Sequence, residues 1–173
     1  MAHVKVERRS MSLKQWARLE FVRIDALVIG QSVRTKNWKV RIGQYFPDKY
    51  VWDGDFQPIE DGDYWGRPDG MAEFRGTVEI PETMMEKKVW FSMLTGAEVI
   101  VWTNGRMLDG IDPNRTRVLL AEQAQPGQQF DMIMEAYVRS KPDDDRSFIT
   151  RDIRGSVQRF NIPELIVLNE EVR

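Results

Sequence analysis

The segment WGRPDGMAEFRGTVEIPETMMEKKVWFSMLTGAEVIVWTNGRMLDGID, residues 65–112, contains the strongest pattern in this chain. Apolar and polar residues alternate in AEFRGTVEI, which predicts a strand with one buried face because successive strand side chains point to opposite sides. The predicted buried face carries Phe74, Val78 and Ile80. Pro81 has no N–H to donate to a ladder, so we expect the strand to end before it.

Two more strands and a hairpin are predicted in the same segment. KKVWFSML is apolar on both faces, including Trp90, so we expect a central strand that is covered on both sides. AEVIVW, with Trp102 in it, leads into Asn104-Gly105. Both turn residues tolerate the positive φ of a type I′ turn, which predicts a hairpin there. We expect Trp90 and Trp102 to be core or inter-sheet residues.

The N-terminal part has a different period. Apolar residues recur every three or four positions over residues 13–28, which predicts an amphipathic helix that ends near Gly30. The segment WKVRIGQYF is predicted as a strand, and the Asp- and Gly-rich residues 48–70 as a loop. RVLLAE and QQFDMIMEAYV are predicted as two later strands. These patterns indicate a mainly β protein with a helical N-terminal segment.

The order of these motifs resembles that of a known family. The chain is similar to the N-terminal β-sandwich domain of family 38 glycoside hydrolases, the α-mannosidases, in WG, EFRGTVEIPE, KKVWFSMLTGAEVIVWTNGRMLDGID and RVLLAEQAQPGQQFDMIMEAYV. Phe160 and PELIVLNEEV, residues 163–172, resemble the last strand of that domain. The resemblance implies a jelly-roll (galactose-binding-like) β-sandwich over residues 37–173, with residues 1–36 as a helical lead-in packed on it.

Jelly-roll domains of β-galactosidase-like and β-glucuronidase-like enzymes share part of this pattern. They also combine an aromatic-Arg strand, a Pro and a Val-Trp-x-Asn-Gly hairpin. The Gly110-Ile111-Asp112 continuation, with Arg115, and the PELIVLNEEV ending favour the mannosidase family. Of the family's catalytic and zinc-binding motifs none has a match here, so the resemblance assigns no catalytic residue to this chain.

Composition limits the classes of partner and site. A chain of 173 residues that is 42% hydrophobic can bury one core, and we expect a single domain. The formal net charge is -2 and no basic cluster is present, so nucleic acid and membrane surfaces are not expected partners. The chain has no Cys and a single His, His3, so we expect no zinc site within it. The N-terminus has no apolar signal region, which predicts a cytoplasmic location.

Exposed aromatic residues and carboxylates are the candidate contact groups. Trp52, Tyr64 and Trp65 lie in or beside the Asp/Gly-rich loop, where they would contact carbohydrate or a neighbouring domain, or pack locally. Carboxylates crowd residues 53–63 and 109–112. Their spacing departs from that of a calcium loop, and turn formation accounts for them, so calcium remains an alternative.

The function implied by the resemblance is that of a non-catalytic N-terminal domain in a zinc-dependent α-mannosidase-like glycoside hydrolase. It would support assembly and form part of the active-site rim. The expected partners are the downstream catalytic domain of the same polypeptide, which would hold the zinc, a mannose-containing saccharide and a second copy of the chain. The chain would then be a fragment of a larger enzyme. Two alternatives stay open: a free-standing carbohydrate-binding module and the jelly-roll domain of a β-galactosidase-like enzyme.

Overall fold

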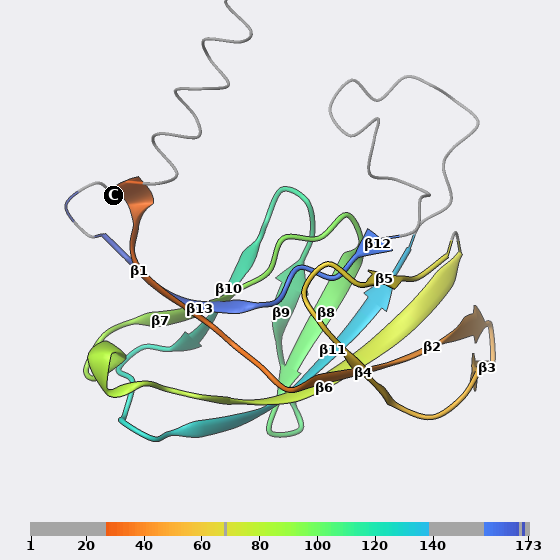
Figure 1. The fold of residues 1–173 in the computed structure, drawn as a ribbon, viewed down its shortest axis with the longest axis horizontal. Helices are drawn as coiled ribbons and strands as arrows, with labels where there is room; N and C mark the ends of the chain where they lie inside the picture. Colours follow the sequence, from red (N-terminus) through yellow and green to blue (C-terminus); the bar gives the residue numbers. More distant parts are fainter. Residues whose placement is uncertain (1–26, 68, 139–157, 170, 172–173) are drawn as a thin grey trace, which may run out of the picture.

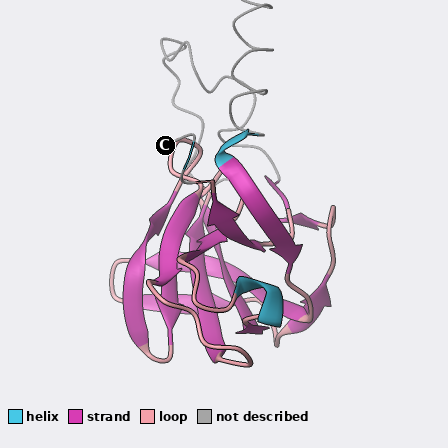
Figure 2. Ribbon diagram, turned by 90° about the vertical axis from the view of Figure 1, so that its left-hand side faces the viewer, coloured by secondary structure: helices cyan, strands magenta, loops and turns pink. Residues whose placement is uncertain are grey.

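The computed structural model describes residues 27–67, 69–138, 158–169 and 171, which form two antiparallel sheets packed face to face (Figures 1 and 2). The four-stranded sheet has the order β1-β13-β7-β10, with β1 at Ile29–Arg34, β13 at Glu164–Leu168, β7 at Val89–Ser92 and β10 at Arg117–Ala121. The seven-stranded sheet has the order β3-β2-β6-β11-β8-β9, with β4 paired to β2.

The strands of the larger sheet are β2 (Trp38–Phe46), β3 (Lys49–Trp52), β4 (Gln57–Ile59), β6 (Gly70–Glu79), β8 (Glu98–Thr103), β9 (Arg106–Ile111) and β11 (Gln129–Tyr137). Two short strands, β5 (Tyr64–Trp65) and β12 (Gln158–Arg159), pair with each other, and a 3-10 helix, η1, spans Glu82–Met84. The mainly β, jelly-roll prediction is thus consistent with the strands that are described.

Aromatic side chains fill the space between the sheets. The Trp38 ring of β2 lies 6.0 Å from the Phe91 ring of β7, and Phe160 stacks on Phe74 of β6 with 5.2 Å between centroids. All four side chains are buried. Trp38 Nε1 donates a hydrogen bond of 2.8 Å to Thr35 Oγ1, so its polar atom is satisfied inside the core.

The alternating strand, the central position of the next strand and the hairpin are confirmed, whereas the outer face of that central strand is not fully covered, since Trp90 is half-buried and Leu94 is 64% exposed. Phe74, Val78 and Ile80 are buried, and β6 ends at Glu79, just before Pro81. Strand β7 lies between β13 and β10, as expected for a central strand. In the β8–β9 turn, Asn104 and Gly105 have φ values of 48° and 76°, which fits the predicted type I′ geometry.

The prediction that Trp90 and Trp102 belong to the core is wrong. Each lies on the outer face of its sheet and is half-buried, because the residues beside them in β7 and β8 point inward. Trp102 pairs with Ile133 on β11 and donates from Nε1 to Glu135 Oε2 at 3.2 Å. A strand that is apolar on both faces does not reveal from sequence which face is inside.

Residues 48–70, predicted as a loop, contain the three short strands β3, β4 and β5. Strands this short tolerate Pro58 and the surrounding Asp and Gly residues. Because of those residues, the sequence shows no apolar–polar alternation from which the strands could be predicted. Residues 29–34, placed in the helical lead-in, form β1 and pair with β13. Most of the predicted helix, and His3, lie outside the described residues.

Candidate ligand-binding face

The outer face of the seven-stranded sheet carries side chains in cross-strand rows. Register places Met71 of β6 opposite Tyr137 of β11, and Tyr137 opposite Glu98 of β8. In the next row Glu135 is opposite Ile100. Neighbouring side chains on one face of an antiparallel sheet lie within contact distance, so these rows form a continuous surface.

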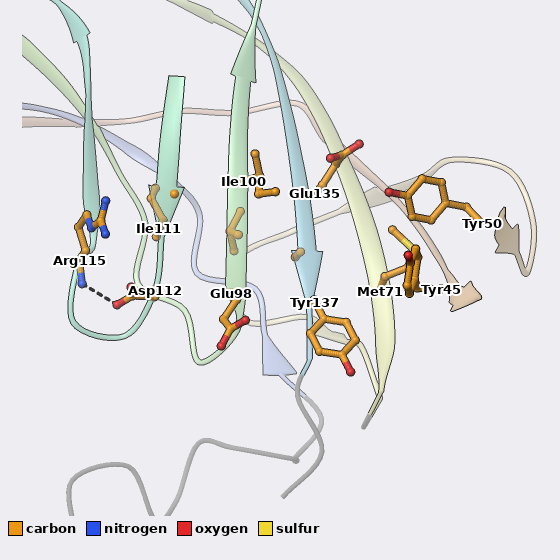
Figure 3. A pocket seen from close by; sticks show the side chains of 13 residues that line it. Tyr45, Tyr50, Met71, Glu98, Ile100, Ile111, Asp112, Arg115, Glu135 and Tyr137 are labelled. Carbon is orange, nitrogen blue, oxygen red and sulfur yellow. Dashed lines mark hydrogen bonds between the residues drawn. The ribbon is translucent and has the colours of Figure 1, made fainter. Parts of the chain in front are cut away.

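A depression of about 580 Å³ lies over this surface, and we call it the outer depression (Figure 3). Figure 3 shows tyrosines from β2 and β3 at one end and the β9–β10 turn at the other. Its lining includes the residues Tyr45, Tyr50, Met71, Glu98, Ile100, Gly110, Asp112, Arg115, Glu135 and Tyr137. A volume of this size lies within the range of small-molecule sites, about 300–1,000 Å³.

The aromatic end of the depression is built by the β2–β3 hairpin. Tyr45 and Tyr50 are register partners whose ring centroids are 5.6 Å apart, and Tyr50 lies 6.0 Å from Trp52. Tyr45 is 55% exposed and Tyr50 is 52% exposed. Tyr137 is fixed differently, because its hydroxyl donates to Asp69 Oδ1 at 3.0 Å. The hairpin therefore presents aromatic rings to solvent at the edge of the sheet.

The opposite end carries charge that is held by a turn. Asp112 Oδ1 accepts the backbone N–H groups of Asn114 at 2.7 Å and Arg115 at 2.9 Å. These hydrogen bonds hold the pKa of Asp112 below its ordinary value, so the carboxylate is ionised at neutral pH. The Arg115 guanidinium donates to Asp109 Oδ1 at 3.0 Å, so part of its charge is already compensated.

A buried ion cluster adjoins the depression. The Glu73 carboxylate, with only 6% of its side chain exposed, is bound by Arg41 from β2 and by Arg75 from its own strand. The Arg41 guanidinium lies 4.0 Å from the Trp52 ring centroid, and both arginines lie against Phe56. Arg75, which points to the opposite face from Phe74, is thus ion-paired while half of its side chain stays exposed. The cluster fixes the residues that follow β3 onto the sheet.

Trp52 and Tyr64, two of the predicted contact residues, lie on different parts of the surface. Trp52 is half-buried, and its ring lies beside Tyr50 at the aromatic end of the face. Tyr64 is 64% exposed on β5, does not line the outer depression, and lies beneath the Arg159 guanidinium. The structure therefore does not bring the two together into one platform.

Trp65, the third predicted contact residue, lies in the core. It is 2% exposed and meets Phe74 edge to face with 4.9 Å between ring centroids. Its Nε1 has no hydrogen-bond partner among the described residues. Because β5 turns this side chain inward while Tyr64 points outward, Trp65 cannot serve as a carbohydrate contact in this fold.

The contact residues predicted from the sequence do not include Tyr45, Tyr50 or Tyr137. One signal was present for the first two, since they flank the dipeptide Pro47-Asp48, which favours a turn, and so would face each other across a hairpin. Nothing local indicates that Tyr137 shares their face, because that depends on the order β2-β6-β11 in the sheet.

Across residues 27–67, 69–138, 158–169 and 171, no group of three or more His, Cys, Asp or Glu side chains is arranged to hold a metal ion. In the same part of the chain no helix has the length and apolar composition required to cross a membrane.

Comparison with known families decides the identity of the domain. A family model described as "Alpha-mannosidase, jelly roll domain" matches residues 31–151, which is more than half of the chain. The chain belongs to this family of α-mannosidase jelly-roll domains. The resemblance to the sandwich domain of family 38 glycoside hydrolases is thereby confirmed.

Solved structures of other glycoside hydrolases share the fold. A putative β-galactosidase from Bacteroides fragilis aligns with a TM-score of 0.54 and 17% identity over 79% of this chain and 23% of that protein. The β-glucuronidase of Faecalibacterium prausnitzii aligns with a TM-score of 0.51 and 14% identity over 80% and 31% of the two chains. This α-mannosidase jelly-roll domain thus spans less than a third of either protein. A search of curated proteins found no match.

Proposed function

We propose that this chain acts as a non-catalytic supporting domain of a zinc-dependent α-mannosidase. The observation that carries the proposal is the family match over residues 31–151, which covers strands of both sheets. In this proposal the zinc and the catalytic residues lie in another domain of the same polypeptide. The jelly-roll domain stabilises that catalytic domain and contributes to the rim of its active site.

The paired carboxyl groups on the described surface favour a supporting role. A glycosidase needs a carboxyl pair that is open to substrate and free to exchange a proton. Glu73 and Glu135 are cross-strand partners on the outer face, yet Glu73 is 5% exposed and bound by Arg41 and Arg75, so it is closed to substrate. This pair therefore lacks the second open carboxyl group that turnover requires.

A domain-deletion experiment on the complete polypeptide tests the proposal. Removal of residues 27–171 should abolish hydrolysis of an aryl α-mannoside, and the separately expressed chain should restore part of it when added back. A chain with Gly54→Ala, which places a methyl group in open space, should restore the activity equally and serves as the control. Full activity after the deletion would contradict a supporting role.

The β-galactosidase-like alternative gives a different outcome in the same experiment. The complete polypeptide would then cleave an aryl β-galactoside and not the α-mannoside. The fold likeness to the putative β-galactosidase alone does not favour that outcome, since the jelly roll serves several glycosidases and identity is 17%.

A further inference from the structure

We propose that the outer depression binds a neutral oligosaccharide, with one sugar ring against Tyr45 and Tyr50 and the hydroxyl groups of the following units directed to the carboxylates of Glu135 and Asp112. The inference adds a ligand site to the proposed function. It rests on that function only for the choice of a mannoside as the first probe.

The aromatic end of the depression matches the chemistry of a pyranose ring. A pyranose ring has an apolar face of C–H groups and a rim of hydroxyls, and it therefore suits a surface that is aromatic beside polar acceptors. Tyr45 and Tyr50 are each more than half exposed, and Ile100 is 43% exposed on the neighbouring part of the same face. Such apolar exposure, gathered at one depression, marks a binding surface.

The carboxylates of Glu135 and Asp112 supply hydrogen-bond acceptors in the depression. Within the described part of the chain, Glu135 accepts a hydrogen bond from the neutral indole of Trp102, and a carboxylate has acceptor capacity for several more. Asp112 is oriented by two backbone N–H groups that both bind its Oδ1. Hydroxyl groups are donors that can satisfy these carboxylates without bringing further charge.

The negative charge that lines the depression excludes other classes of ligand. The carboxylates of Asp112 and Glu135 line the depression, and the one guanidinium that lines it among the described residues, that of Arg115, is already bound to Asp109. A uronate or a phosphate would be repelled. An apolar protein surface laid over the face would strip water from the carboxylates without replacing their hydrogen bonds, which is costly. A neutral polyol fits both constraints.

Gly110 leaves space open in the floor of the depression. Gly110 is the register partner of Ile100 on the outer face, and a Cβ built on it meets its nearest neighbour, the Val99 carbonyl oxygen, at 3.6 Å. That distance is an ordinary contact, so the fold does not require glycine there. The missing side chain instead keeps the floor of the depression open.

The test is a titration of the ¹⁵N-labelled chain with mannotriose, followed by NMR chemical shifts and calorimetry. We expect saturable shifts at Tyr45, Tyr50, Ile100 and Gly110. Gly110→Leu, which fills the floor, and Tyr45→Ala, which removes a ring, should each weaken binding at least tenfold while circular dichroism stays unchanged. Tyr64→Ala, an exposed tyrosine outside the depression, should bind as the unmodified chain does and is the matched control.

Each other outcome decides a specific point. If neutral sugars other than mannosides bind at these residues, the saccharide site is supported and its link to mannose is rejected. If no neutral saccharide binds at millimolar concentration, or if folded Gly110→Leu binds normally, the site is overturned, whereas the supporting role is judged separately by the deletion experiment. Preferential binding of glucuronate, or dimerisation through this face in sedimentation, would also overturn it.

Discussion

Gly76→Ala should destabilise the domain through one contact in the core. A Cβ on Gly76 would lie 2.9 Å from two ring carbons of Trp38, whereas carbon atoms normally approach to about 3.5–4.0 Å. The Trp38 ring cannot retreat easily, because Phe91 and Phe160 pack against it and Thr35 accepts a hydrogen bond from its Nε1. Overpacking of this kind typically costs about 1–3 kcal/mol.

The direction of the stability change distinguishes this contact from the ordinary effect of replacing glycine by alanine. Glycine within a strand usually costs about 0.5–1 kcal/mol relative to alanine, so Gly76→Ala would be stabilising if the Trp38 contact did not exist. With a cost of about 2 kcal/mol, Tm should fall by about 4–8 °C in a domain of this size. Urea unfolding followed by tryptophan fluorescence gives the free energy of unfolding directly.

Gly54→Ala is the control for the same chemical change. A Cβ on Gly54 meets nothing within 4 Å and the residue has no positive φ, so its free energy of unfolding should change by less than about 0.5 kcal/mol. If Gly76→Ala is as stable as this control or more stable, the packing of Trp38 against β6 is not as described.

Three other substitutions test separate features. Glu73→Ala leaves two arginines unpaired on a partly buried surface and should lower the free energy of unfolding in urea by about 3 kcal/mol. Glu122→Ala removes an exposed ion pair and should lower it by less than about 1 kcal/mol. Equal effects of the two substitutions would refute the buried cluster. Gly105→Val should cost about 1 kcal/mol or more from backbone strain alone, since a Cβ there has open space around it, and a neutral melt would contradict the type I′ turn. Two backbone N–H groups lower the pKa of Asp112, so its stabilising contribution is present above the unfolded pKa of about 3.9 and is lost as pH falls through the lower folded pKa. Asp112→Asn should remove this pH dependence in acid unfolding. An NMR titration midpoint for Asp112 at or above about 3.9 would disprove the lowered pKa.

Local rules predicted the parts of the fold that local chemistry determines. Phe74, Val78 and Ile80 are buried because alternation on a one-sided strand leaves a single choice of face. Asn104-Gly105 forms the hairpin because few other residues adopt positive φ at both positions. In both cases the deciding interaction lies within a few residues of sequence.

The candidate site depended on pairings that sequence alone does not reveal. Trp38 and Trp102 both lie in predicted strands, yet the first is in the core and the second is on the outer face. Both faces of β8 are apolar, so the inward direction was set by its pairing with β11. Likewise Tyr45 and Tyr137 share a surface only because β6 separates their strands by one position in the sheet.

The most direct test of the central claim is the substrate of the complete polypeptide. Hydrolysis of an aryl α-mannoside and of an aryl β-galactoside should be measured before and after removal of zinc with a chelator, with the 173-residue chain assayed in parallel. A supporting domain of a zinc-dependent α-mannosidase predicts that the complete polypeptide cleaves only the α-mannoside, loses this activity without zinc, and that the chain alone is inactive. Cleavage of the α-mannoside by the chain alone, or of the β-galactoside by the chelator-treated polypeptide, would contradict the account.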